Sequence, residues 1–298
     1  MFESSEKSRV FGLPPGADFP AELVAGVLSR MEGRPPESLA RVTVLVNTRR
    51  MQRRLKALFS LGPARLLPRI GLVTDLDPLL PGTDLPTPIS ALRRRLELTS
   101  LVSKLLELDP SIAPRAASAD LADSLAALMD EMQGEGVHAD TLMNLDVSDQ
   151  SGHWARSLRF LSIVHQYATA TSGARLDPEA LRRLMAEKLV ARWADKPPEH
   201  PVIIAGSTGS RATTSLLMQA AAKLPLGAVV LPGFDFDMPA QVWRSLLDPS
   251  VSPLGSEDHP QYRFADLLTR LGIGPGDVGN WGKPAERQHR NELISLSL

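Results

Sequence analysis

The stretch RVTVLVNTRRMQRRLKALF, residues 41–59, predicts one buried strand that runs directly into one basic helix. Between Val42 and Val46 every residue but one is apolar. Such a run is too dense for a strand with one wet face and is typical of a parallel sheet that is covered on both sides. Asn47 and Thr48 then carry short side-chain oxygens that can accept hydrogen bonds from the first amides of a helix.

The predicted helix has two faces of different chemistry. Four apolar residues recur at helical spacing and are expected to face the sheet: Met51, Leu55, Leu58 and Phe59. Five basic residues occupy the rest of its surface: Arg49, Arg50, Arg53, Arg54 and Lys56. Parallel sheets bind ligands in the crevice at the carboxyl ends of their strands, and helix N-termini attract anions. The helix is therefore a candidate phosphate-binding element.

The composition is that of a soluble globular protein and limits the kinds of site. The chain has 298 residues, 43% of them hydrophobic, and can bury a substantial core in one large or two smaller domains. Its 33 Lys and Arg nearly balance its 34 Asp and Glu, so a nucleic-acid site has to be a local patch. The absence of cysteine excludes disulfides and thiolate metal sites from this segment. No apolar run approaches the roughly 20 residues of a membrane span, and residues 1–9 lack a signal-peptide core, so a cytoplasmic location is expected.

Strands and helices alternate at both ends of the chain, with a block of helices between them. Besides residues 42–46, four short apolar runs are candidate strands: Val10–Leu13, Arg69–Val73, Val202–Ala205 and Ala228–Leu231. This order predicts an α/β fold with a parallel sheet and an inserted all-helical subdomain. The predicted segments are residues 1–88 and 199–240 for the two parts of the α/β domain, 89–198 for the insertion, and 241–298 for a helical and loop-rich region that leads to a further domain.

The insertion is expected to contain four helices. The first should bury a stripe of leucines, at positions Leu92, Leu96, Leu101, Leu105 and Leu108. The second should bury Leu121, Leu125, Leu128, Met129 and Met132. The third is expected over about residues 154–170, and the fourth over Pro178–Trp193.

The turn after the first strand does not have the composition of a phosphate loop. Such a loop needs glycine amides and a Lys-Ser/Thr pair, whereas here Pro14 and Pro15 have no amide hydrogen and Asp18 would repel phosphate. The turn GSTGSR, residues 206–211, could hold an anion at a helix N-terminus, but an ordinary turn with a Ser or Thr cap is favoured because the lysine is absent.

The order of elements resembles the first RecA-like domain of superfamily 1 helicases, a P-loop NTPase-type fold (1A) with a helical insertion (1B). VTVLVNTRRMQRRLKALF resembles helicase motif Ia, which in that family touches the backbone of single-stranded DNA. VIIAGSTGS and VVLPGFDFD occupy the places of the Walker B strand and motif III. The resemblance implies that Thr48, Arg49, Arg50, Arg53 and Arg54 are the DNA-binding residues; the alternative is a solvated helix face.

Longer phrases resemble the AddB subunits of AddAB helicase–nucleases of the alphaproteobacterial type, which process double-strand breaks. They include RVFGLPPGADFP, ADSLAALMDEMQGEGV and PVIIAGSTGSRATTSLLMQA, and the likeness covers essentially the whole chain. Family members are several times longer and end in a RecB-type nuclease domain, so this chain resembles their N-terminal part. The resemblance implies an AddA-type motor subunit as partner in a heterodimer, and a role in DNA end resection for homologous recombination.

This chain departs from the family pattern at the nucleotide site. Pro14, Pro15, Gly16, Ala17 and Asp18 do not match a Walker A sequence, and the Walker B acidic pair is replaced by two neutral residues, Gly206 and Ser207. Met238 follows Asp237 where motif III has glutamine. The segment is therefore predicted to be non-catalytic alone, with no cofactor or metal, although full-length family members belong to ATP-dependent helicase/exonucleases. Two alternatives stay open: a docking module without DNA contact, and a doubly wound small-molecule or nucleotide-binding enzyme.

Several other polar and aromatic residues allow both a structural and a functional interpretation. Arg93, Arg94 and Arg95 either flank a DNA path or, as favoured, form the solvated face of the first inserted helix. Asp130 and Glu131 are expected at a solvated helix end. Three tryptophans could stack on bases, but core packing is favoured: Trp193, Trp243 and Trp281. The histidines lack metal-ligand spacing, and His153 with Trp154 is expected to be a packing pair.

Overall fold

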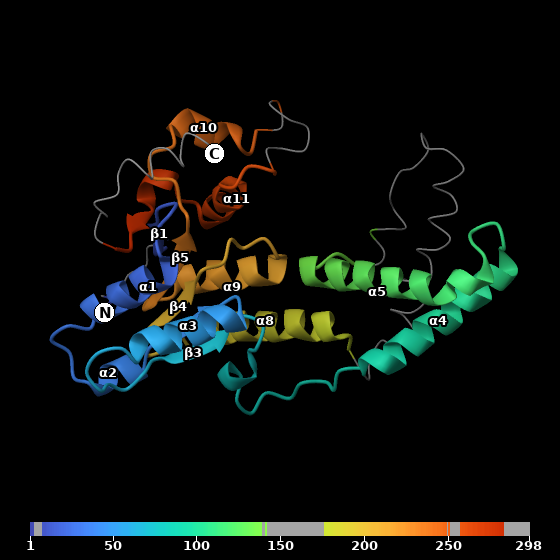
Figure 1. The fold of residues 1–298 in the computed structure, drawn as a ribbon, viewed down its shortest axis with the longest axis horizontal. Helices are drawn as coiled ribbons and strands as arrows, with labels where there is room; N and C mark the ends of the chain where they lie inside the picture. Colours follow the sequence, from blue (N-terminus) through green and yellow to red (C-terminus); the bar gives the residue numbers. More distant parts are fainter. Residues whose placement is uncertain (3–7, 139–140, 142–175, 249, 251–256, 283–298) are drawn as a thin grey trace. The chain divides into compact units, whose positions relative to one another are not determined.

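The computed structural model describes residues 1–2, 8–138, 141, 176–248, 250 and 257–282. The chain divides into two compact units, one of residues 1–79 with 188–298 and one of residues 80–187 (Figure 1). The second unit overlaps the predicted insertion of residues 89–198. The predicted third inserted helix and the pair His153–Trp154 lie outside the described residues.

The first unit is built on one sheet in which every pairing between described strands is parallel, in the order β3-β2-β4-β5-β1-β6. The strands are β1 (Val10–Leu13), β2 (Thr43–Val46), β3 (Arg69–Leu72), β4 (Val202–Ala205), β5 (Gly227–Pro232) and β6 (Gly279–Asn280). The predicted α/β fold with a parallel sheet is thus confirmed.

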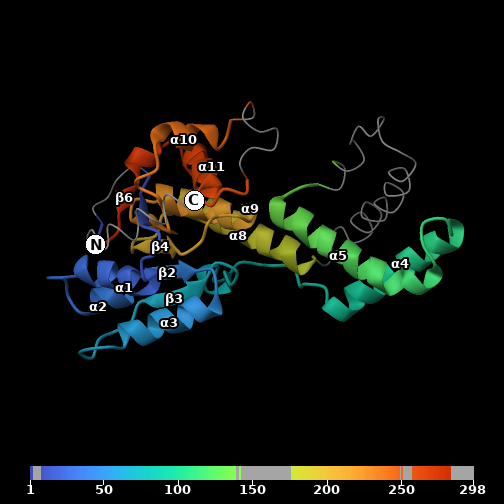
Figure 2. The same cartoon turned by 45° about the horizontal axis from the view of Figure 1, so that its top comes forward.

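Helices cover both faces of this sheet (Figure 2). On one side lie α1 (Phe19–Ser29) and α3 (Arg49–Phe59), and on the other α9 (Ala212–Lys223) and α11 (Tyr262–Leu271). Because side chains alternate along a strand, Val44 and Val46 pack in the core beneath α1 and α3 while Leu45 faces the opposite layer. All three are at most 1% exposed, which explains the unbroken apolar run in the sequence.

Shorter elements complete the first unit. They are α2 (Glu37–Ala40), α10 (Ala240–Ser245) and two short 3-10 helices, Asp77–Leu79 and Pro275–Asp277. The sequence predicted only helices and loops over residues 241–298, and the edge strand β6 was missed. It is two residues long and pairs with β1 through Gly279, where an added Cβ would come within 2.9 Å of the Phe11 ring.

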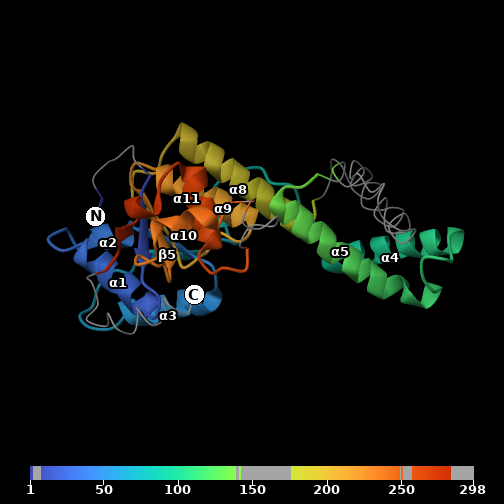
Figure 3. The ribbon, with the colours of Figure 1, turned by 90° about the horizontal axis from the view of Figure 1, so that it is seen from above.

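The second unit contains α4 (Ala91–Leu108), a 3-10 turn (Arg115–Ala117), α5 (Ser118–Glu135) and the start of α8 (Pro178–Asp195), which runs on into the first unit. Helices α4 and α5 pack side by side (Figure 3). The predicted buried face of α5 is confirmed, since Leu125, Met129 and Met132 are buried and Leu121 and Leu128 pack against them.

The predicted leucine stripe of α4 is wrong in part. Leu92, Leu96 and Leu108 are 68%, 62% and 85% exposed among the described residues. The buried face instead follows a spacing of four residues, through Arg94, Leu98, Val102 and Leu106. Because this row begins with an arginine, apolar periodicity alone does not identify the buried face. No helix in the described ranges is both long and apolar enough to cross a membrane.

Candidate nucleic-acid interface

The carboxyl edge of the sheet gathers three of the loops that the sequence singled out. From β2 the chain moves outward to β3, whereas from β4 it moves in the opposite direction to β5. Adjacent strands whose connections diverge leave a crevice at their carboxyl ends, which is the usual ligand position in such sheets. In this sheet the divergence falls between β2 and β4, so the start of α3 and the turn that begins at Gly206 are the segments at this position.

Helix α3 begins at this edge with a well-formed cap. The N-cap is Thr48, whose Oγ1 accepts a hydrogen bond from the Met51 amide at 3.1 Å. Gln52 Nε2 donates to the Ile70 carbonyl at 2.6 Å and ties the helix to β3. Leu55 and Phe59 are 0% and 1% exposed, so the predicted apolar face is the one that packs on the sheet.

All four candidate DNA-binding arginines are exposed: Arg49, Arg50, Arg53 and Arg54. At about 100° per residue, they and Lys56 cover a continuous arc of the helix opposite the buried face. Arg54 lies 4.0 Å from the Asp18 carboxylate, and both side chains are more than half exposed, so this pair stabilises little. The guanidinium groups of Arg49, Arg50 and Arg53 have no hydrogen bond or ion pair with a described residue.

This charge arrangement is unfavourable for the helix itself. Arg49 and Arg50 stand in the first turn, where the helix dipole already concentrates positive charge. The pairs Arg49–Arg53 and Arg50–Arg54 are like charges four residues apart, each costing about 0.2–0.5 kcal/mol. The helix has no acidic residue to offset them. A ligand with closely spaced negative charges would attract the same side chains and so offset this repulsion.

The loop after β1 is a tight turn with few free amides. The Ala17 amide donates to the Pro14 carbonyl at 3.3 Å, and Gly16 has a φ of 79°, as a type II turn with Pro15 at its second position requires. Asp18 then caps α1 by accepting from the Ala21 amide at 3.4 Å. A carboxylate at a helix N-terminus occupies the place where a phosphate would bind, which supports the prediction that this turn is not a phosphate loop.

The turn after β4 is closed by apolar side chains. Gly206 has a φ of 76°, and an added Cβ there would lie 3.1 Å from the Phe19 ring and 3.5 Å from the Met51 methyl group. Ser207 is buried, and its hydroxyl accepts from the Gly209 amide at 3.2 Å. The expected Ser or Thr cap is not found, because the N-cap of α9 is Arg211.

The segment after β5 is held by a residue that the sequence analysis missed. Gln261, 1% exposed, accepts from the Asp235 amide at 3.1 Å and donates to the Gly233 carbonyl at 2.8 Å. The Asp235 carboxylate in turn accepts from the Asp237 amide at 2.9 Å. A buried glutamine 26 residues downstream gives no local sequence signal. Within the described part of the chain, no three His, Cys, Asp or Glu side chains gather as a metal site would require.

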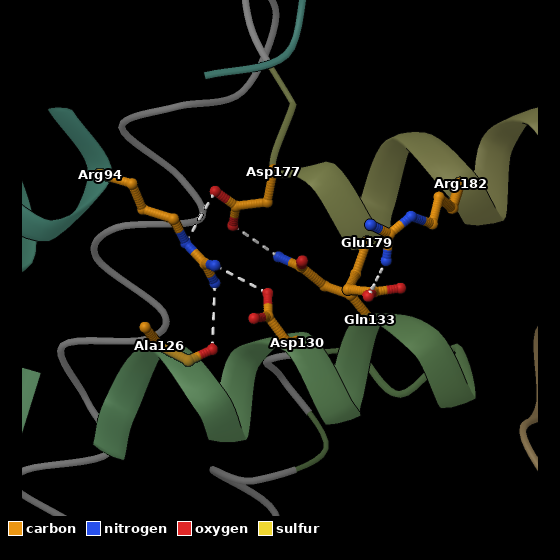
Figure 4. A network of polar contacts seen from close by, with 7 residues as sticks. All are labelled: Arg94, Ala126, Asp130, Gln133, Asp177, Glu179 and Arg182. Carbon is orange, nitrogen blue, oxygen red and sulfur yellow. Dashed lines mark hydrogen bonds and ion pairs between the residues drawn. The ribbon is translucent and has the colours of Figure 1, made fainter. Parts of the chain in front are cut away.

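Arg94, predicted on a solvated face, is instead 6% exposed, so that prediction is wrong (Figure 4). Its Nη1 donates to Asp130 at 2.7 Å and its Nη2 to the Ala126 carbonyl at 3.2 Å. Its Nε lies 3.0 Å from the buried Asp177 carboxylate, although the contact is not aligned as a hydrogen bond. Gln133 Nε2 donates to the other oxygen of Asp177 at 2.8 Å.

Asp130, which was predicted to lie at a solvated helix end, also belongs to this network. Its carboxylate lies within α5 and is 41% exposed, because one side reaches Arg94. Together these groups join α4, α5 and the residue before α8 inside the second unit. Arg95, one residue along, keeps the predicted exposed position and pairs with Asp123 at 2.7 Å. Asp123 raises the pKa of the Arg95 guanidinium through this hydrogen bond.

The favoured interpretation of the tryptophans is confirmed, since Trp193, Trp243 and Trp281 are 6%, 5% and 2% exposed. Trp281 Nε1 donates to the Leu23 carbonyl at 3.2 Å, and the Arg30 guanidinium lies 3.9 Å from the Trp281 ring centroid. Burial lowers the pKa of Arg30. These rings are core groups and are not available to stack on bases.

Comparison with known proteins gives no family assignment. No family model matches the chain, and no curated protein matches it.

Proposed function

We propose that this chain is an ATPase-inactive, helicase-like segment that binds single-stranded DNA through the basic face of α3. In this proposal it is the N-terminal part of an AddB-type subunit, which docks on an AddA-type motor subunit in the cytoplasm and serves DNA end resection for homologous recombination. The proposal combines the sequence resemblance with one structural observation, the exposed positive face of α3, a helix that contains no acidic residue and begins at the carboxyl edge of the sheet.

The basic face fits a phosphate backbone better than a single anion. Its side chains spread along the helix on the solvent side, and Arg49, Arg50 and Arg53 have no partner among the described residues. Backbone contacts of this kind are independent of sequence and position a strand without reading it. If this exposed face served only to stabilise the helix, an acidic residue four positions from an arginine would be favourable. Helix α3 contains no acidic residue.

The sheet is proposed to be RecA-like, and residues 80–187 to correspond to the helical insertion of helicases. The parallel strands, the divergent connections that follow β2 and β4, and a helical unit between β3 and β4 support this assignment. Neither Asp18 at the cap of α1 nor the turn at Gly206 provides a phosphate cradle, so strand movement would depend on the partner motor.

Titration of labelled single-stranded DNA against the chain at rising salt tests the proposal. For single strands, the logarithm of the binding constant falls with that of salt by about 0.7 per phosphate contact. Replacing Arg49 and Arg50 by alanine should therefore weaken binding and reduce the slope by about 1.4. The matched control removes two arginines of α11 that have acidic partners, Arg263 and Arg270, and should leave the slope unchanged.

Two outcomes would contradict the proposal. If both double variants bind DNA with the slope of the unchanged chain, α3 is not the contact surface. If the unchanged chain binds no DNA at low salt, a docking module without DNA contact is the better interpretation. Calorimetric titration with Mg-ATP addresses the remaining alternative, since micromolar binding would favour a nucleotide-binding enzyme.

A further inference from the structure

We propose that a pocket beside the end of β5 is a docking site for a partner-protein segment in which an apolar anchor is flanked by Lys and Arg. The pocket has a volume of about 780 Å³ and lies entirely within the first unit. Its walls come from the loop after β5, from α10 and α11, and from the turn before β6. It is separate from the basic face of α3, and its lining includes one acidic and one basic residue, Asp235 and Arg244.

Aromatic rings form one wall of this pocket. Phe234, 1% exposed, stacks on Trp243 with ring centroids 5.1 Å apart and meets the edge of Phe236 at 4.9 Å. Phe236 is 36% exposed, so part of a phenyl ring faces solvent at the pocket. Such a wall, anchored in the core and open on one side, suits the insertion of an apolar or aromatic side chain.

The polar groups of the pocket are fixed in place. Asp235, 2% exposed, lines the pocket and is positioned by the buried Gln261. Arg244, whose charge is opposite to that of Asp235, also lines the pocket. Its Nε donates to the Ala240 carbonyl of its own helix at 3.3 Å. A carboxylate beside aromatic rings is a combination that favours cations.

The two stretches of chain that surround the pocket, and that supply all of its lining residues, are acidic. Residues 233–248 and 257–282 contain seven Asp and Glu but only three Arg, a net charge of −4, and two of these arginines pair with Glu257 and Asp266. Asp237 and Asp277 are exposed on segments that line the pocket. This field repels a phosphate backbone and attracts Lys and Arg. Charge complementarity therefore favours a basic protein segment over DNA as the occupant.

Two synthetic peptides with the same apolar residues test the proposal: Lys-Arg-Leu-Phe-Lys-Leu-Arg and Glu-Glu-Leu-Phe-Glu-Leu-Glu. Each carries a fluorescent label and is titrated with the full chain at low and high salt. The basic peptide should bind, and its affinity should fall with salt, whereas the acidic peptide should bind at least about tenfold more weakly.

Matched variants assign the binding to the pocket. Phe236→Ser should weaken the basic peptide about tenfold or more, whereas Val242→Ser should change it less than about twofold. Val242 is 37% exposed on α10, close to the 36% of Phe236, but does not line the pocket. Asp237→Lys should weaken the basic peptide and strengthen the acidic one.

Three results would overturn the proposal: no binding of the basic peptide, equal binding of both peptides, or equal effects of Phe236→Ser and Val242→Ser. Single-stranded DNA is titrated against the same variants. Unchanged DNA affinity in Phe236→Ser is expected, and a loss of DNA affinity would reassign the pocket to nucleic acid. Because α3 is intact in these variants, failure of this proposal leaves the DNA-binding proposal standing, and the reverse also holds.

Discussion

Replacing Arg94 by methionine removes the charge at the centre of the helical unit while keeping most of the side-chain volume. The substitution removes the ion pair with Asp177 and the hydrogen bonds to Asp130 and to the Ala126 carbonyl. The Asp177 side chain is 4% exposed and would be left as a buried charge whose remaining donor is Gln133. Breaking a buried pair by removing one partner costs about 3–5 kcal/mol.

Hydrogen exchange of the native protein measures this loss of stability directly in the helices of the second unit. The chain has two compact units, so one global unfolding curve would mix their stabilities. In Arg94→Met, amides of α4 and α5 should exchange at least about a hundredfold faster, because each 1.4 kcal/mol is a factor of ten. Amides of β2 and β4 in the other unit serve as the internal reference and should not change.

Two further variants separate burial from charge. Arg95→Met removes the adjacent arginine, which makes a similarly short ion pair with Asp123 but is exposed, and exchange should stay close to that of the unchanged chain. The double variant Arg94→Met/Asp177→Leu leaves no buried charge and should recover most of the lost protection. Equal effects of Arg94→Met and Arg95→Met, or no recovery in the double variant, would refute the reasoning.

Three other substitutions test the packing and the cap. Leu98→Ala should destabilise α4 by about 2–5 kcal/mol and Leu92→Ala should have little effect, as read by the same exchange experiment; equal effects would mean that the buried face is misassigned. Gly26→Ala should destabilise the first unit by about 1–3 kcal/mol despite the better helix propensity of alanine, because its Cβ would lie 2.3 Å from Trp281 Nε1; a raised melting temperature would contradict this. Thr48→Ala should cost about 0.5–2 kcal/mol through loss of the cap, and should leave the salt slope of DNA binding unchanged if the hydroxyl serves only the helix.

The strands could be predicted because their signal is local. All five predicted runs coincide with strands to within one residue at each end, since a strand buried in a covered parallel sheet is apolar along most of its length. The position of α3 could be predicted equally well, because Leu55 and Phe59 recur at helical spacing and Thr48 precedes them as a cap. These features depend on residues that are neighbours along the chain.

The features that the sequence analysis missed depend on distant partners. Arg94 is buried only because carboxylates from α5 and from the residue before α8 converge on it. Gln261 is buried because it bridges two backbone groups at the end of β5, and nothing in its own neighbourhood predicts that. Since polar residues usually mark exposed positions, a buried polar group inverts the pattern on which helix faces are assigned.

The near-neutral composition conceals two fields of opposite sign in one unit. Residues 49–59 carry a charge of +5 with no acidic residue, while the surroundings of the β5 pocket carry −4. Screening acts over about 8 Å at physiological salt, so each proposed ligand would respond to the local charge of its surface and not to the net charge of the chain. Folding gains nothing from five like charges on one short helix, and the first turn is the worst place for two of them. If α3 binds DNA as proposed, removing charge from this helix should therefore stabilise the free protein while it weakens DNA binding.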